Sequence, residues 1–376
     1  MGLMPSSVAD SLRGGVSTPS WQVVRAIRFG QMNRGGTGSN GHALDLDVYG
    51  LRVRIEDPRQ AISGLLGLDY AWFASPPGDG GADLDVVIGD ERPDIRRFTG
   101  ARAISIGPRS VLYRWNGHLV TDMGGNAIVE YEPLRKRVLV NYRDEQVAHE
   151  ALFTFLNKRI NTHFDKLGLV RLHALALVGQ HGGATALMLP SGGGKTTLAL
   201  QVLESDGVKL LSDDAPLIDR RGMVYPFPLR MGLTASDAPA EARTRLRPIE
   251  LMEARAKLAI EVETFKDRIA AHPEPLRHLV IGRRVLTDKA SLYQARRRDA
   301  VGPLFRESIV RPNFYEGLRI LQENGGKEKV QKFRGLAGRA VCCASFLKGA
   351  RVWALDMGTN HASNRDALLP LLEGRR

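Results

Sequence analysis

Three consecutive glycines, followed by a lysine and two threonines in LMLPSGGGKTTLAL (187 to 200), are the feature that most constrains this chain. They separate an apolar run at 184–189 from a second run at 195–205 that lacks glycine and proline. The first run predicts a strand buried on both faces, and the second predicts a helix. A loop between such a strand and helix binds phosphate well, because its backbone N–H groups and the positive helix end converge on one point.

The residue types of the loop match the needs of a nucleotide triphosphate. Lys195 is expected to reach the β- and γ-phosphates, and the hydroxyl of Thr196 to ligate Mg²⁺. The full set of predicted nucleotide contacts is Ser191, Gly192, Gly193, Gly194, Lys195, Thr196 and Thr197. The usual motif, G-x-x-x-x-G-K-[ST], starts with glycine, whereas Leu189 stands at that position here. A flexible glycine turn with a solvated lysine is the alternative, and the flanking strand and helix favour the phosphate site.

Two adjacent carboxylates, Asp213 and Asp214, lie in a third apolar run at 208–218. Beside a phosphate loop they could divide two tasks: one would hold Mg²⁺, directly or through water, while the other accepts the proton of an attacking hydroxyl. The sequence does not decide which aspartate is the base. An ordinary acidic turn is the alternative explanation, and the nearby loop favours a catalytic role.

Charge and composition restrict the partners and the compartment. The 376 residues carry a formal charge of +12, but the excess is spread along the chain and aromatic residues make up only 6%. Neither a nucleic-acid-binding motif nor an apolar run of 18 residues occurs, so neither nucleic acid nor a membrane is an expected partner. The two cysteines, Cys342 and Cys343, are adjacent and unsuited to a disulfide framework, which predicts two buried core residues in a cytoplasmic protein.

The order of residue patterns predicts three parts. A disordered leader is expected over 1–20, a small α+β domain over 21–143 and a second domain over 144–376. Strands are predicted as a pair at 41–57 turning at Gly50, at 83–89 and 110–115, as two runs within 126–142, and at 169–179, 184–189, 208–218, 278–286 and 350–358. Helices are predicted at 58–73 with Pro58 in the first turn, at 144–164 with Asp144 as the cap, and at 195–205, 234–270, 312–324 and 364–374.

Four stretches together resemble the catalytic domain of the HPr kinase/phosphorylase family, including related bacterial kinases that modify peptides. They are LHALALV (172 to 178), LPSGGGKTTLAL (189 to 200), LLSDDAPLI (210 to 218) and YPFPL (225 to 229). The resemblance implies an α/β fold: a P-loop kinase core with a mixed sheet, like that of HPr kinases and carboxykinases, over 144–376. It also implies a role for His173, which would otherwise be interpreted as a core histidine on a strand.

This resemblance implies an ATP- and Mg²⁺-dependent kinase that phosphorylates a serine or other hydroxyl of a peptide, protein or small molecule. The catalytic residues would be Asp213, Asp214, His173 and Lys195, and the magnesium ligands Thr196 and Asp213. The Glu-Arg-Gly stretch of the family is not found after Asp214, so a divergent kinase is expected rather than the reverse phosphorylase reaction. Residues 21–143 are expected to recognise the substrate, and the sequence leaves a homo-oligomer open.

Two other functions remain as alternatives. ATP occupancy could switch a regulatory or nucleic-acid-binding surface without any kinase reaction, although a simple nucleotide binder does not need two adjacent aspartates. A carboxykinase-like enzyme would need further metal ligands, which the sequence does not reveal. The basic stretches at 291–298 and 326–334 could attract an acidic acceptor, although such clusters are more often solvated faces.

Overall fold

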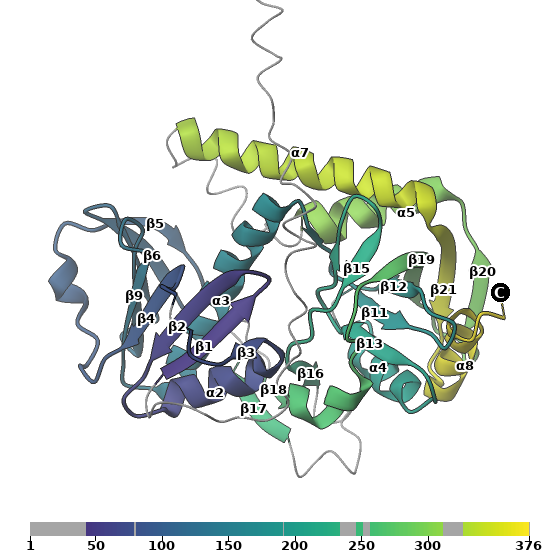
Figure 1. The fold of residues 1–376 in the computed structure, drawn as a ribbon, viewed down its shortest axis with the longest axis horizontal. Helices are drawn as coiled ribbons and strands as arrows, with labels where there is room; N and C mark the ends of the chain where they lie inside the picture. The colour runs from purple at the N-terminus through teal and green to yellow at the C-terminus, as the bar shows by residue number, and fades with distance from the viewer. Residues whose placement is uncertain are drawn as a thin grey trace, which may run out of the picture. The chain divides into compact units, whose positions relative to one another are not determined.

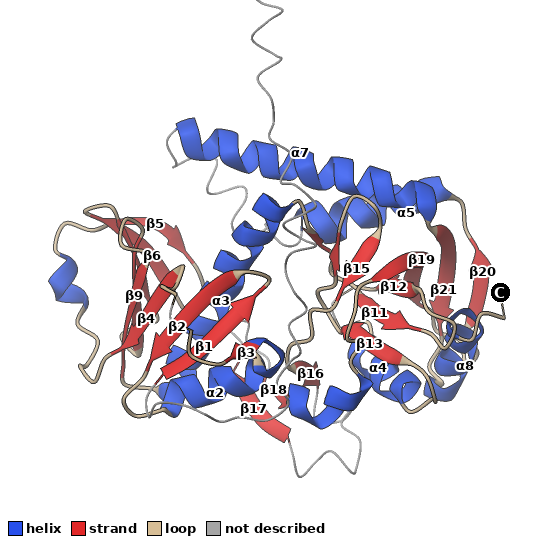
Figure 2. Cartoon of the chain, viewed as in Figure 1, coloured by secondary structure: helices blue, strands red, loops and turns tan. Residues whose placement is uncertain are grey.

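A computed structural model gives the fold of the chain and describes residues 43–78, 80–190, 192–233, 246–250, 256–310 and 326–375. Large mixed sheets combine with helices (Figure 2), which confirms the predicted α/β class. The predicted leader at 1–20 and the predicted helix at 312–324 lie outside the described residues. Residues 35–376 form one compact unit, and the boundary predicted between 143 and 144 stays a prediction.

The first sheet contains nine strands in the described part of the chain, in the order β3-β1-β2-β4-β9-β8-β7-β6-β5. Figure 1 labels β1, β2, β4 and β9 among them. Their bounds are β1 Ala43–Val48, β2 Leu51–Glu56, β3 Ala74–Ser75, β4 Leu84–Ile88, β5 Arg102–Ile106, β6 Val111–Trp115, β7 His118–Asp122, β8 Ala127–Glu132 and β9 Arg137–Tyr142. β2, β4 and β9 run parallel, and the other neighbours pair antiparallel. The predicted strand pair and its turn at Gly50, where φ is 86°, are confirmed.

The first helix starts later than predicted. α2 spans Ala61–Asp69 and is followed by the short helix η2 (Ala71–Phe73), so Pro58 lies in the preceding turn rather than in the helix. The reason is the carboxylate of Asp57, whose Oδ2 accepts the backbone N–H groups of Ile62 and Ser63 at 2.9 Å each. These bonds satisfy two of the free donors of the first helical turn and fix where the helix begins.

The long helix α3, Glu145–Leu167, confirms its sequence signals. Asp144 Oδ1 accepts the N–H groups of Gln146 and Val147, and Gly168 ends the helix in the left-handed conformation. Both ends therefore have the capping residues that local backbone chemistry favours. α3 packs on β8 and β9 of the first sheet.

The second sheet holds the glycine loop, and its main path among the described residues has the order β10-β14-β15-β19-β12-β11-β13, with β21 beside β19 and β20 beside β21. The strands are β10 Val170–Arg171, β11 Leu175–Val178, β12 Ala184–Met188, β13 Lys209–Ser212, β14 Leu217–Ile218, β15 Met223–Tyr225, β19 Glu274–Arg284, β20 Ser291–Gln294 and β21 Arg351–Met357. One cluster of apolar side chains joins this sheet to α4 (Lys195–Leu203) and α8 (His361–Leu372), and another joins it to α5 (Arg297–Leu304) and α7 (Gly326–Gly349). The predicted strand at 184–189 is thus buried on both faces.

Two predicted strands prove to be interrupted. The run 169–179 breaks at His173, since β10 pairs with β14 while β11 pairs with β12 and β13. The run 208–218 breaks at Asp213 and Asp214, between β13 and β14. Both apolar runs are continuous in sequence, but the two halves of each run pair with different strands of the sheet. The breaks place three polar side chains at strand ends instead of inside strands.

Where the chain is described, the helix predicted over 234–270 is replaced by strands at 246–250 and 256–260, and only a short stretch near its end is helical. β17 (Leu246–Glu250) and β18 (Ala256–Ile260) pair with β16 (Met231–Leu233), and the short helix η6 covers Val262–Arg268 with a break at Phe265. Alanine, arginine and glutamate favour a helix locally, but strand pairing overrides such weak preferences. Residues 234–245 and 251–255 lie outside the described residues.

The C-terminal part contains elements that the sequence did not reveal. α5 begins at the arginine cluster, the chain continues through η7 (Phe305–Val310), and α7 runs through the basic stretch. Cys342 and Cys343 are buried in α7, as predicted, and burial raises the pKa of Cys342 to about 12. In the portion that the structure describes, no helix is both long and apolar enough to cross a membrane.

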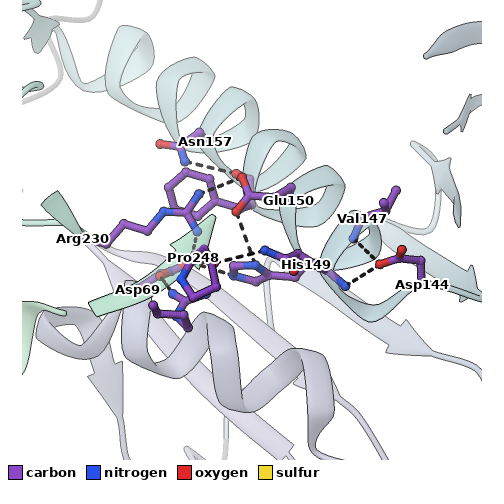
Figure 3. A network of polar contacts seen from close by, with 11 residues as sticks. Asp69, Asp144, Val147, His149, Glu150, Asn157, Arg230 and Pro248 are labelled. Carbon is purple, nitrogen blue, oxygen red and sulfur yellow. Dashed lines mark hydrogen bonds and ion pairs between the residues drawn. The ribbon is translucent and has the colours of Figure 1, made fainter. Parts of the chain in front are cut away.

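A network of buried charges joins α2 and α3 to the three-stranded sheet (Figure 3). Arg230, just before β16, donates to Asp69 Oδ2 at 2.9 Å and to Glu150 Oε2 at 2.8 Å. His149 Nε2 lies 2.7 Å from Asp69 Oδ2, and Arg247 of β17 donates to the other oxygen of Asp69. Asp69 thus has two guanidinium partners and shares one of them with Glu150, so that each buried carboxylate is paired, as buried charges require.

Replacing Arg230 with methionine is expected to lower the free energy of unfolding by about 3–5 kcal/mol, because two buried carboxylates would lose a partner. Urea unfolding checks this value. The control is Arg220→Met, an exposed arginine that should change stability by less than about 0.5 kcal/mol. Equal stability of the two variants would show that the network contributes little.

Candidate functional site

The glycine loop joins the end of β12 to α4, and its conformation depends on glycine. Gly192 and Gly194 have φ values of 72° and 93°, in the region that other residues rarely adopt. A Cβ on Gly193 would lie 2.8 Å from the carbonyl oxygen of Pro190, to which the Gly193 N–H donates. Gly194 caps α4 without a side-chain hydrogen bond, which leaves backbone N–H groups of the first turn for a ligand.

Lys195, the first residue of α4, is buried at the base of the loop. Its Nζ donates to the carbonyl oxygen of Leu189 at 3.0 Å and lies 2.9 Å from His173 Nε2. His173 Nδ1 in turn lies 2.9 Å from Asp214 Oδ1, which is 3.5 Å from Lys195 Nζ. Because an ammonium group only donates, His173 Nε2 accepts, and its Nδ1 carries the proton donated to Asp214.

A second pair of side chains lies beside the first. Thr196 Oγ1 donates to Asp213 Oδ2 at 2.8 Å. The other oxygen of Asp213 is buried and has no hydrogen-bond partner among the residues that the structure describes. A carboxylate oxygen and a hydroxyl oxygen are hard donors of the kind that Mg²⁺ prefers. Thr196 and Asp213 therefore fit a magnesium ion, and the free oxygen of Asp213 is the observation that supports it.

The two aspartates differ in acidity. Burial, together with the charge of Asp214, raises the pKa of Asp213 to about 6, although the hydrogen bond from Thr196 acts against this rise. Desolvation also acts to raise the pKa of Asp214. The hydrogen bond from His173 and the charge of Lys195 outweigh that effect, so the pKa of Asp214 falls to about 2. Asp214 is therefore charged at neutral pH, and its side chain is 56% exposed.

Sheet topology explains why these residues meet. β11 lies between β12 and β13 and is antiparallel to both, so the ends of β12 and β13 lie at the same edge as the start of β11. The glycine loop follows β12, the aspartates follow β13, and His173 precedes β11. Ligand sites of mixed and parallel sheets commonly form at such an edge.

The structure brings together most of the predicted site residues. Gly192, Gly193, Gly194, Lys195, Thr196, His173, Asp213 and Asp214 lie in the loop or at the neighbouring strand ends. Thr197 is the third residue of α4 and is partly buried. Ser191 lies outside the described residues.

The sequence patterns did not point to two arginines that lie near the loop. Arg284 ends β19, which runs parallel to β12, and its Nη1 lies 3.8 Å from the position that a Cβ on Gly194 would occupy. Arg171, at the end of β10, is close enough to Asp214 for their charges to interact. The pair Arg283-Arg284 directly after an apolar run could have revealed the first, since the ends of parallel strands share an edge.

No protein-family model matches the chain, and a search of curated proteins finds no match either. The resemblance to the HPr kinase/phosphorylase family stays a prediction.

Proposed function

We propose that this chain is an ATP- and Mg²⁺-dependent kinase with a P-loop core like that of HPr kinases, and that it phosphorylates a hydroxyl of a peptide, protein or small molecule. The observation that supports the proposal best is the meeting of a glycine loop, a buried lysine, a histidine and two aspartates at one sheet edge. Phosphoryl transfer depends mainly on positioning and on neutralising charge, and these groups supply both.

In this proposal the loop and α4 hold the phosphates of ATP. The N–H groups of the loop and of the first turn of α4 donate to phosphate oxygens, and Lys195 adds a positive charge. The hydrogen bonds of Lys195 to Leu189 and His173 and its ion pair with Asp214 restrict its ammonium group before ATP arrives. Arg284 adds a second cation near Gly194.

Thr196 and Asp213 would hold the magnesium ion, which, when bound, neutralises charge on the phosphates. The pKa of about 6 lets Asp213 ionise at neutral pH. Protons compete with the metal for Asp213 below that pH, so magnesium affinity falls there.

Asp214 is the group that accepts the proton of the attacking hydroxyl. Its side chain is exposed, and His173 fixes one of its oxygens while Lys195 lies beside the same oxygen. The low pKa of Asp214 keeps it ionised, although it also makes Asp214 a weak base. A weak base suffices where the transition state is loose and the proton leaves late.

Transfer of labelled γ-phosphate from ATP tests this function. The purified protein is incubated with magnesium and with peptides encoded near its gene, alongside a reaction containing EDTA. Label is expected on an acceptor hydroxyl only when magnesium is present. If ATP binds but neither transfer nor hydrolysis occurs, the nucleotide-switch alternative replaces the kinase.

A further inference from the structure

Arg171 is a partly buried cation next to the candidate site, on β10 and two residues before His173. Its Nη1 donates to Asn161 Oδ1 at 3.0 Å and to Asn157 Oδ1 at 3.2 Å. Its guanidinium group also lies over the ring of Phe227, with Cζ 5.5 Å from the ring centre. Two amides and one aromatic ring thus fix the position of this guanidinium group.

Arg171 lacks the partner that buried arginines usually have. In the described part of the chain, no carboxylate forms an ion pair with it, and its Nε and Nη2 make no hydrogen bond. By contrast, Arg339 binds both oxygens of Asp165, and Arg230 binds two carboxylates. Burial acts to lower the pKa of Arg171, while the charge of Asp214, which lies beyond ion-pair distance, acts to raise it, so the guanidinium group stays charged. A partly buried guanidinium group that is not hydrogen-bonded to a carboxylate favours the binding of an anion.

The free edge of the guanidinium group has the shape that an anion needs. The two asparagines occupy Nη1, which leaves Nε and Nη2 as a pair of parallel donors. Such a pair binds the two oxygens of a carboxylate or phosphate group. A lysine offers no equivalent fork, so the residue type itself is informative.

The position of Arg171 indicates that the anion it binds belongs to the acceptor of the phosphoryl group and not to ATP. The phosphates of ATP are assigned to the loop after β12, whereas the charge of Arg171 acts on Asp214, the proposed acceptor of the hydroxyl proton. We infer that Arg171 forms an anion subsite that binds a carboxylate or phosphate group of the acceptor, beside its reacting hydroxyl. This inference rests on the proposed kinase function and narrows the acceptor to a hydroxyl compound that carries such a group.

Binding of small anions to the nucleotide-loaded protein tests the subsite. The protein is first saturated with magnesium and the non-hydrolysable ATP analogue AMP-PNP, so that the loop is filled. It is then titrated with sulfate, which mimics phosphate, and with malonate, which carries carboxylates. We expect saturable binding of at least one anion by calorimetry, and the better ligand identifies the group on the acceptor.

Three variants identify the residue responsible. Arg171→Gln should weaken anion binding at least tenfold, and Arg171→Lys should weaken it less, while both still bind AMP-PNP. The matched control is Arg159→Gln, which removes another arginine that stacks on an aromatic ring, that of Tyr131, with Cζ 4.7 Å from the ring centre. The control should bind anions as the unmodified protein does.

The possible failures are distinct. Absence of AMP-PNP binding would overturn the kinase proposal and the subsite with it. Normal AMP-PNP binding without saturable anion binding, or equal anion binding by Arg171→Gln and the unmodified protein, would overturn the subsite alone.

Discussion

Replacing Lys195 with methionine is expected to reduce phosphoryl transfer at least 1,000-fold, which corresponds to about 4 kcal/mol of transition-state stabilisation. Methionine keeps the unbranched stem but removes the ammonium group that, under the proposed function, lies next to the phosphates of ATP. The measurement is transfer of labelled phosphate at saturating ATP. The control is Lys209→Met, which removes an exposed lysine at the start of β13 and should retain full activity.

The same substitution tests whether the lysine is structural. Loss of the bond to the carbonyl oxygen of Leu189 should cost about 1–3 kcal/mol, so the variant should still unfold cooperatively at a lower temperature. A Lys195→Met protein that fails to fold would give the ammonium group a structural role. Lys195→Arg, which keeps the charge but changes its geometry, would then show whether transfer depends on the lysine itself.

Replacing Asp213 with asparagine is expected to stabilise the protein at pH 8 and to abolish its response to magnesium. The pKa of Asp213 in the folded chain, about 6, lies above its usual value of 3.8, so the folded state binds this proton more tightly than the unfolded state does. The protonated carboxyl group of Asp213 therefore adds to the free energy of unfolding below pH 4, and this contribution is lost as the pH rises through 6. Ionised Asp213 therefore costs up to about 3 kcal/mol at pH 8, and asparagine avoids this cost.

Urea unfolding at pH 4.5 and pH 8, with and without magnesium, measures both effects. The gain should appear mainly at pH 8, and magnesium should stabilise the unmodified protein but not Asp213→Asn. Asp214→Asn is the matched control, since the lowered pKa of Asp214 means that its ionised form stabilises the fold above pH 4. An equal change for Asp213→Asn at both pH values would assign the effect to packing rather than to ionisation.

Local sequence patterns were enough to predict the centre of the site. The strand, glycine loop and helix around Lys195 lie consecutively in the chain, and so do the caps of α3, Asp144 and Gly168. Each of these features depends on residues within one or two turns of backbone. The glycine loop and the two aspartates could therefore be singled out before the sheet was known.

Features that depend on pairing between distant segments could not be predicted. The break at His173 exists because β10 and β11 pair with different strands, and β17 forms a strand despite its neighbours' helical composition. The place of Arg171 beside Asp214 depends on the same break, since β10 pairs with β14. No periodicity in a single segment reveals such contacts.

The position of β11 between β12 and β13 has an evolutionary consequence. The three segments that carry the loop, the histidine and the aspartates belong to neighbouring strands, so the register of one strand sets their mutual distances. Under the proposed function, substitutions around Arg171 would change which acceptor binds without altering the distances among the loop, the histidine and the aspartates. New acceptors would then arise by changes outside β11, because selection must preserve the register of that strand.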